Sequence, residues 1–217
     1  QRMPRAHLPS WQICAPSSPS WHDGLVATRT PTLATVEALV AEPSLALREV
    51  VAGDDRRTRP ISWIASSDLA DPTPFLAPDH VLLTTGRQLV ADETSPARYV
   101  RALVDAGVLG LGFGTGLHAQ AVPPALVDAA LAADLPLLEV PYDTSFLAII
   151  RWNAELGAAR DRWAADAQRS IGAAASRADG AAAVVRTLAR ELGADVALLD
   201  ERARVRAAST GVVDDAL

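Results

Sequence analysis

The sequence has no lysine, one cysteine and few aromatic residues. All 20 basic residues are arginine, which together with the many alanines indicates a GC-rich coding sequence and does not indicate a function. The single cysteine, Cys14, excludes an intrachain disulfide framework. No apolar run approaches the roughly 18 residues of a membrane span, and the N-terminus lacks the charged-then-apolar pattern of a signal peptide. We therefore expect a cytoplasmic protein with no membrane partner.

Acidic residues outnumber basic ones, and the formal net charge is -6. The imbalance is concentrated in residues 32–150, where 7 Arg stand against 15 Asp and Glu for a net charge of -8. A surface of this sign repels the phosphate backbone of nucleic acids. We therefore expect no direct DNA binding by this part of the chain.

Four segments follow one another along the chain. Residues 1–31 mix Pro, Ser and Trp without periodicity and are expected to be an irregular leader. Residues 32–144 are predicted to form the first domain, and residues 145–178 a long helix. Residues 179–217 are predicted to begin a second domain that is truncated, because one helix and one hairpin cannot close a core.

Short apolar segments alternate with amphipathic ones in the first domain. Strands are expected at 47–52, 60–65, 81–85, 108–113 and 137–140, and helices at 35–41, 96–106 and 123–134. The last three strands alternate with helices, which is typical of βαβ units. We therefore predict an α/β fold with a mainly parallel sheet, followed by the long helix and a truncated α+β segment with a helix at 181–192 and a hairpin of 196–199 and 205–208.

Four blocks of the first domain carry a resemblance to a known family. They are Trp63–Leu76, Val81–Gly86, Ala106–Gly116 and Leu135–Pro141. In this order and spacing they resemble the N-terminal domain of PucR-type (purine-catabolism-regulator-like) transcriptional regulators, and the last segment of the chain resembles the opening of their GAF-like middle domain. The resemblance implies a ligand-responsive regulator of catabolic genes whose helix-turn-helix has no counterpart here.

Candidate ligand residues lie mainly at the carboxyl ends of the predicted strands, where open parallel sheets bind their ligands. The candidates are hydroxyl, carboxylate and glycine residues: Ser67, Asp68, Thr84, Thr85, Gly86, Gly112, Gly114, Thr115, Gly116 and Glu139. A structural interpretation competes with each assignment. Serine and aspartate often initiate turns, threonine can cap a strand end, and Glu139 can face solvent.

The most distinctive motif is Gly110–Gly116, in which every second residue is glycine. Glycines allow a ligand to approach the backbone, and successive N–H groups can form an anion nest. The spacing is not that of a dinucleotide-binding loop, and no Gly-Lys-Ser/Thr follows, so a nucleoside triphosphate loop is unsupported. The motif is therefore either a structural turn or a ligand-lining loop.

The sequence contains no clear set of residues for catalysis, metal binding or a cofactor. His80 and His118 lack partners at metal-ligand spacing, and Cys14 has no paired histidine. No arrangement of nucleophile, base and orienting group is found. We therefore expect no enzymatic activity, no metal and no cofactor.

Apolar and polar residues recur at alternating three- and four-residue steps in segment 145–178, as in a heptad seam. The predicted dimer-interface residues are Phe146, Ile149, Asn153, Leu156 and Trp163. The alternative is that this stripe packs on its own domain, with Gly157 and Gly172 weakening the helix.

Three functions remain open on the sequence alone. The favoured one is the effector-sensing and dimerisation part of a PucR-type regulator of purine or related nitrogen metabolism. Such a chain would bind a small-molecule effector, form a homodimer and contact DNA only through a C-terminal domain that this sequence lacks. The alternatives are a small-molecule or nucleotide-binding enzyme domain and a structural interaction module without a ligand.

Overall fold

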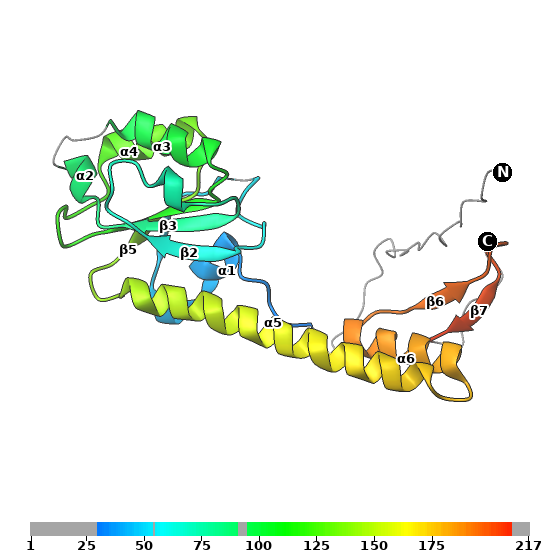
Figure 1. Ribbon diagram of the computed structural model, residues 1–217. Coiled ribbons are helices and arrows are strands. Elements are labelled where there is room, and N and C mark those ends of the chain that lie inside the picture. The colour runs from blue at the N-terminus through cyan, green and yellow to red at the C-terminus, as the bar shows by residue number, and fades with distance from the viewer. Residues whose placement is uncertain (1–29, 54, 91–94, 210–217) are drawn as a thin grey trace, which may run out of the picture. The chain divides into compact units, whose positions relative to one another are not determined.

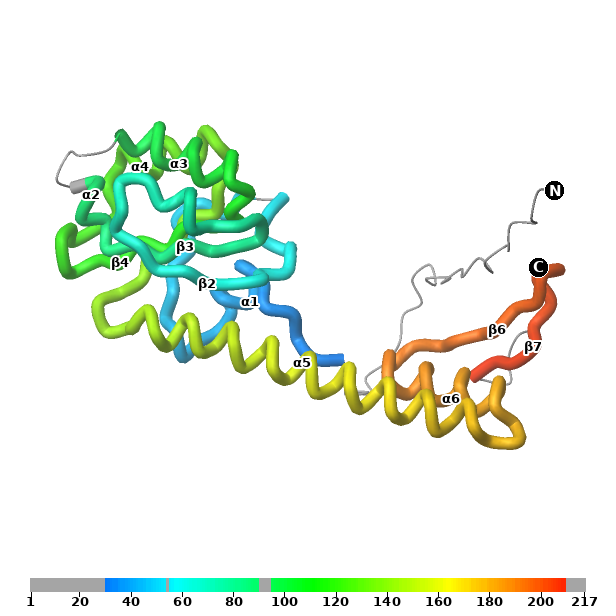
Figure 2. Tube along the Cα trace, in the orientation of Figure 1, coloured from blue at the N-terminus to red at the C-terminus, as the bar shows by residue number. Residues whose placement is uncertain are grey.

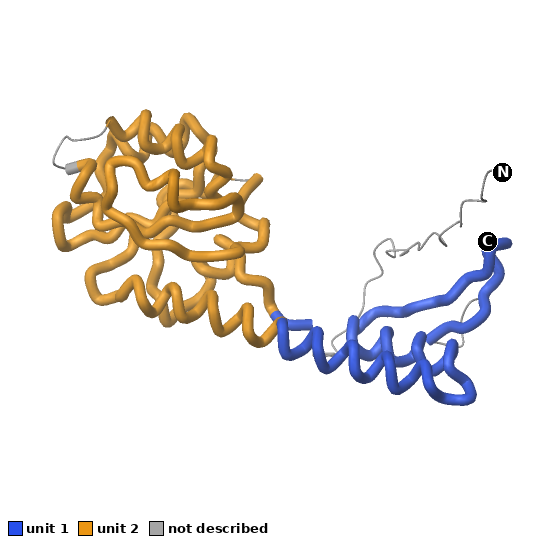
Figure 3. The backbone as a smooth tube through the Cα atoms, viewed as in Figure 1, with its two compact units in different colours: residues 1–31, 161–217 blue, residues 32–160 orange. Residues whose placement is uncertain are grey.

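The structure is a computed structural model that describes residues 30–53, 55–90 and 95–209. The predicted irregular leader therefore lies outside the described residues, apart from its last two positions, and so does the end of the chain from residue 210. The chain divides into two compact units (Figure 3): residues 32–160 form one, and residues 161–217 belong to the other together with residues 1–31.

The first unit is built on a five-stranded sheet with the strand order β1-β5-β4-β3-β2 (Figure 1). The strands are β1 (Arg48–Val51), β2 (Trp63–Ser66), β3 (His80–Thr84), β4 (Gly110–Gly114) and β5 (Leu137–Val140). Strands β2 to β5 are parallel, and β1 pairs antiparallel with β5 at the edge. The predicted α/β fold with a mainly parallel sheet is confirmed.

Helices cover both faces of this sheet. Helices α3 (Pro96–Asp105) and α4 (Pro124–Ala132) pack on one face, and α1 (Val36–Ala41) and the start of α5 (Phe146–Ala175) pack on the other. Figures 1 and 2 show α3 and α4 above the sheet and α1 and α5 below it. The first pair shares a face because β3, β4 and β5 follow one another in the same direction, and crossovers of one hand then fall on one side. Short helical segments complete the unit: η1 (Pro43–Leu45), η2 (Thr73–Phe75) and α2 (Arg87–Val90).

The segment between β1 and β2 does not join neighbouring strands, because these two strands lie at opposite edges of the sheet. It runs past α1, where the Glu37 amide donates a hydrogen bond to the Arg57 carbonyl at 3.0 Å. Helix α1 begins where the sequence predicted, because the Thr35 hydroxyl caps it by accepting from the Ala38 amide at 3.0 Å.

Helix α5 is a single helix of 30 residues, about 45 Å long at a rise of 1.5 Å per residue. Gly157 and Gly172 lie within it and do not break it. Ile149 is fully buried in the core of the first unit, so the first turns of α5 belong to that unit. From Asp161 onward the helix belongs to the second unit.

The second unit contains the rest of α5, helix α6 (Gly180–Leu192) and an antiparallel hairpin of β6 (Ala197–Leu199) and β7 (Val205–Ala208). Helix α6 ends at Gly193, which adopts a left-handed conformation with φ of 62°. The hairpin packs on α6, whose Ala183 and Val185 are buried. The helix and the hairpin predicted for this segment are confirmed.

Strand β4 has only glycines, and so no side chains, on the face of the sheet that α1 and α5 cover. Side chains alternate along a strand, so Leu111 and Phe113 point to the α3–α4 face and the glycines lie on the other. A Cβ atom at Gly112 would lie 2.5 Å from Leu83 Cδ2, and one at Gly114 would lie 3.0 Å from Phe146 Cζ. The glycines of β4 are therefore required for close packing on this face.

Gly112→Ala is expected to destabilise the first unit by about 1–3 kcal/mol, the usual cost of overpacking a core. Leu83 is only 1 % exposed, so its side chain has little room to move away from the new methyl group. Urea denaturation of the full chain measures the change. The matched control is Gly157→Ala, where no heavy atom lies within 4 Å of the added Cβ. That change should stabilise α5 by about 0.5–1 kcal/mol, and equal stability of the two variants would contradict the packing argument.

Candidate functional site

A shallow cleft of ≈ 150 Å³ opens at the carboxyl ends of β3, β4 and β5. This is the edge at which open α/β sheets bind their ligands. Its apolar lining comes from Leu117, Val140, Pro141 and Phe146, and its hydroxyl groups come from Thr85, Thr115, Thr144 and Ser145. The exposed Tyr142 adds an aromatic ring and a phenol hydroxyl to the lining. The cleft therefore combines apolar surface with a small set of hydrogen-bonding groups, as ligand sites usually do.

The loop between β5 and α5 supplies one wall of the cleft. The Thr144 amide donates to the Pro141 carbonyl at 2.9 Å, which closes a turn directly after the strand. Ser145 then caps α5 by accepting from the Ala148 amide at 3.1 Å. Thr144 and Ser145 were not among the ligand residues predicted from the sequence, although a loop that follows a parallel strand must leave from the same edge of the sheet.

Asp68 ties the end of β2 to the end of β3 through three hydrogen bonds. Its Oδ1 accepts from the Thr84 hydroxyl at 2.8 Å and from the Thr85 amide at 2.7 Å, and its Oδ2 accepts from the Thr85 hydroxyl at 2.6 Å. Partial burial alone would raise the pKa of Asp68, but the hydrogen bonds from Thr85 and Thr84 outweigh it and hold the pKa below its usual range. The carboxylate is therefore ionised at neutral pH and acts only as an acceptor.

Thr84 lies beneath the cleft and not in it. It is fully buried, and its hydroxyl oxygen accepts from the Gly86 amide and from Gln88 Nε2, both at 3.1 Å. The Tyr99 hydroxyl is buried beside this group without a hydrogen bond of normal geometry among the described residues, and burial raises the pKa of Tyr99 to about 12. Thr84 and Gly86 thus organise the end of β3 from the interior.

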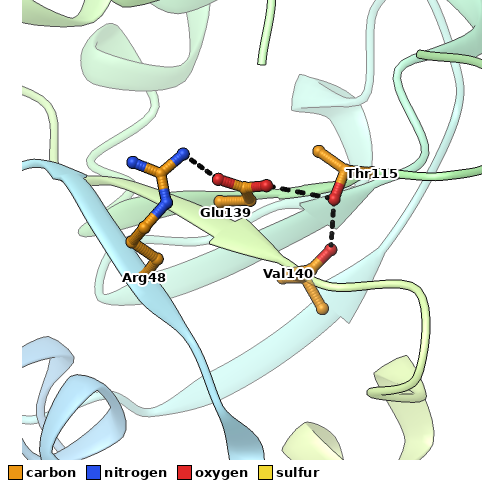
Figure 4. Close-up of polar contacts among 4 residues, drawn as sticks. All are labelled: Arg48, Thr115, Glu139 and Val140. Carbon is orange, nitrogen blue, oxygen red and sulfur yellow. Dashed lines mark hydrogen bonds and ion pairs between the residues drawn. The ribbon is translucent and has the colours of Figure 1, made fainter. Parts of the chain in front are cut away.

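Glu139 is held between two elements and does not simply face solvent (Figure 4). Arg48 lies opposite it on β1 and forms an ion pair with it. The Thr115 hydroxyl donates to Glu139 Oε1 and to the Val140 carbonyl, both at 3.3 Å. Glu139 and Thr115 were predicted from the sequence as ligand residues, but Arg48 was not, because its position depends on the pairing of β1 with β5.

The glycine-rich segment supplies no row of free amides. The Thr115 amide donates to the Val140 carbonyl at 2.9 Å, and the Gly116 amide donates to the Ala119 carbonyl at 2.8 Å. Gly114 and Thr115 line the cleft, whereas Gly112 lies inside the sheet. The Thr115 and Gly116 amides are therefore already bonded within the protein. Outside this segment, Ser67 accepts from the Leu69 amide at 3.2 Å in a local turn.

The predicted dimer-interface residues fall into two groups. Ile149 and Asn153 are buried within the first unit, and Phe146 packs against Gly114 of β4. These three side chains therefore contact their own domain. Leu156 and Trp163, further along α5, are only partly covered.

Within residues 30–53, 55–90 and 95–209, no group of three or more His, Cys, Asp or Glu side chains could hold a metal ion. No helix in the same ranges is both long and apolar enough to cross a bilayer.

Asp68→Asn is expected to lower stability by about 1–2 kcal/mol at pH 7, the low end for hydrogen bonds to a charged group, because Asp68 is exposed. The pKa of Asp68 is lower in the folded state than in the unfolded state. Its contribution is therefore complete well above a pH of about 4 and is lost as the pH falls through the folded pKa. Urea unfolding at several pH values should show the gap between parent and variant closing in acid.

The control for this measurement is Asp105→Asn, which changes an exposed carboxylate without a side-chain hydrogen bond in the described part of the chain. Its stability should differ little from that of the parent throughout the series. A gap for Asp68→Asn that stays constant down to a pH of about 3 would contradict the role assigned to the ionised carboxylate.

Comparison with known proteins shows what this chain is similar to. The model of the PucR family, described as purine catabolism regulatory protein-like, matches residues 38–153. The transcriptional activator PmfR of Paenarthrobacter nicotinovorans is 28% identical over 117 residues, which make up 54% of this chain and only 25% of that protein. The CBS and DRTGG domains of the regulatory region of Clostridium perfringens pyrophosphatase, solved with the activator diadenosine tetraphosphate, are a distant structural likeness. The TM-score is 0.38 and the identity is 10%, over 60% of this chain and 50% of the other. Because the family match covers more than half of the sequence, the chain belongs to the purine catabolism regulatory protein-like (PucR) family.

Proposed function

We propose that this chain is the effector-sensing and dimerisation part of a cytoplasmic PucR-family transcriptional regulator of catabolic genes, and not an enzyme. The observation that carries the proposal is the cleft at the carboxyl ends of β3, β4 and β5, which lies within the segment that the family model matches. The effector is a small metabolite of purine or related nitrogen metabolism. The relative PmfR is named as a transcriptional activator, which supports a regulatory role.

A route from the cleft to the rest of the protein starts at Phe146. This residue lines the cleft, is the first residue of α5 and packs on Gly114 of β4. A ligand that favours one position of the Phe146 ring therefore biases the first turn of α5. Because α5 is one uninterrupted helix, the proposal makes it the element that carries the signal onward.

DNA binding is assigned to a C-terminal domain outside residues 1–217. The net charge of -8 over residues 32–150 opposes contact between this part of the chain and a phosphate backbone. In this proposal residues 32–144 form the sensory domain, residues 145–178 the linker and dimerisation helix, and residues 179–217 the start of a GAF-like domain.

The dimer is proposed to form through partly exposed positions of α5 that lie beyond the core of the first unit. Leu156 and Trp163 are seven residues apart and so lie on the same side of the helix. Both side chains are partly exposed, whereas Ile149 and Asn153, earlier in the stripe, are buried within the first unit. The proposed seam is therefore shorter than the stripe in the sequence.

A thermal-shift screen of the full chain against nucleobases, ureides and amino-acid metabolites tests the effector proposal. A compound at about 100 times its Kd stabilises the folded state by about 2.7 kcal/mol. For a protein of this size that corresponds to a rise in Tm of roughly 5–10 °C. Thr115→Val should weaken the response to any hit, whereas Thr58→Val, at an exposed threonine away from the cleft, should not. A screen without hits, or a hit indifferent to Thr115→Val, counts against the cleft as effector site.

Light scattering of charge-substituted variants tests the dimer proposal. Leu156→Glu and Trp163→Glu are expected to convert a dimeric parent into a folded monomer, because a buried unpaired carboxylate disfavours the interface. Ala158→Glu is the matched control, since Ala158 is exposed and lies on nearly the opposite side of the helix from Leu156. A parent that is monomeric at about tens of micromolar removes the proposal, and thermal melts show whether each variant remains folded.

A further inference from the structure

We infer that the cleft selects a small, planar, nitrogen-rich ligand that presents N–H donors and carries no negative charge. The inference rests on the proposed function, because it takes the cleft as the effector site, and it adds the chemical class of the ligand. It depends on which hydrogen-bonding groups of the lining are already used within the protein.

Each of the three threonine hydroxyls of the lining donates its only proton to the protein. Thr85 donates to Asp68 Oδ2 at 2.6 Å, and Thr144 donates to the Leu45 carbonyl at 2.8 Å. Thr115 donates to Glu139 and to the Val140 carbonyl, both at 3.3 Å. Carboxylates and carbonyls can only accept, so the direction of these bonds is fixed. Whatever these hydroxyls present to a ligand is therefore a lone pair.

The backbone amides of the same three threonines are also used internally. The Thr85 amide donates to Asp68, the Thr115 amide to the Val140 carbonyl, and the Thr144 amide to the Pro141 carbonyl, at distances of 2.7 to 2.9 Å. Amides of this kind are what an anion-binding loop turns toward its ligand. Here they point into the protein, so the loops at this edge are poor anion receptors.

The carboxylates behind the cleft also disfavour a negatively charged ligand. Asp68 and Glu139 each lie one hydroxyl group away from the lining, behind Thr85 and Thr115. Glu139 is neutralised by Arg48, whereas among the described residues no arginine forms an ion pair with Asp68, whose charge is offset only by the more distant His118. An anion entering the cleft would lose its hydration, would gain few donors beyond the Ser145 and Tyr142 hydroxyls, and would approach the Asp68 carboxylate.

Two hydroxyls of the lining can donate to an acceptor on the ligand. The Ser145 hydroxyl accepts from the Ala148 amide and keeps its own proton, and it lies at the N-terminus of α5, where partial positive charge gathers. The exposed Tyr142 phenol makes no hydrogen bond among the described residues. The lining as a whole therefore fits a ligand with several N–H groups and one or two acceptors, such as an amide, a urea or an amidine.

The volume and the apolar walls set the size of the ligand. A cavity of roughly 150 Å³ in another protein holds one benzene molecule, so this cleft of ≈ 150 Å³ suits a single ring. Phe146 and the exposed Leu117 supply apolar surface against which a flat ring can pack. A ligand with a phosphate or a second ring system would extend beyond the cleft.

Three probes of nearly equal shape test the inference: benzamidine, benzamide and benzoate. They share one ring and a planar polar group, and they differ in charge and in the number of N–H donors. We expect NMR titration of the full chain to show benzamidine and benzamide binding at least about tenfold more tightly than benzoate, a factor typical of one hydrogen bond gained or lost. Signals of Thr85, Thr115 and Phe146 should shift with the bound probes.

Variants of one lining residue separate donor recognition from a general loss of structure. Thr115→Val removes the lone pair and should weaken benzamide about tenfold, whereas Thr115→Ser keeps the hydroxyl and should bind nearly as tightly as the parent. Thr58→Val, at an exposed position outside the cleft, should leave the affinity unchanged. Equal affinities of Thr115→Val and Thr115→Ser would overturn the inference.

The outcomes distinguish this inference from the proposed function. Benzoate binding in the cleft as tightly as benzamide would overturn the inference and leave the cleft as an effector site. If none of the three probes shifts the cleft signals while a screened metabolite does, the assignment of ligand class fails alone. If neither the probes nor any metabolite binds there, the inference and the proposed function fail together.

Discussion

The contact between the glycine face of β4 and the residues that fill it is the constraint on which the rest of the first unit depends. A central strand without side chains on one face leaves a shallow furrow along the sheet. Val36 of α1 occupies it at Gly110, Leu83 and Val140 lean over Gly112, and Phe146 of α5 occupies it at Gly114. The positions of α1 and α5 therefore follow from the sequence of one strand.

The same contact determines where the cleft lies. Phe146 can begin α5 directly beside the carboxyl end of β4 because Gly114 has no side chain to keep it away. The turn after β5 brings Thr144 and Ser145 to that edge, and the ends of β3 and β4 bring Thr85 and Thr115. Parallel strands make this convergence possible, since their carboxyl ends meet on one side of the sheet.

Two carboxylates act behind the cleft by orienting hydroxyl groups. Asp68 fixes Thr84 and Thr85 at the end of β3, and Glu139 fixes Thr115 at the end of β4. Glu139 lies on β5 and Asp68 follows the end of β2, and each is next to the strand whose end carries the hydroxyl that it orients, so the bonds also tie neighbouring strand ends together. Stability of the edge and the proposed selectivity of the cleft thus depend on the same interactions.

Local sequence pattern alone determined much of this protein. It predicted the apolar strands, the helices that begin with proline, the long helix α5 and the parallel order of β3, β4 and β5. Each of these features depends on residues that are close in sequence. Partners distant in sequence were decided by tertiary structure. The pairing of Arg48 with Glu139 requires β1 to cross to the far edge, and the burial of Ile149 and Asn153 requires α5 to fold back on the sheet. The sequence also left open whether the β4 glycines serve a ligand or the fold, because only the position of Phe146 shows what fills the space beside Gly114.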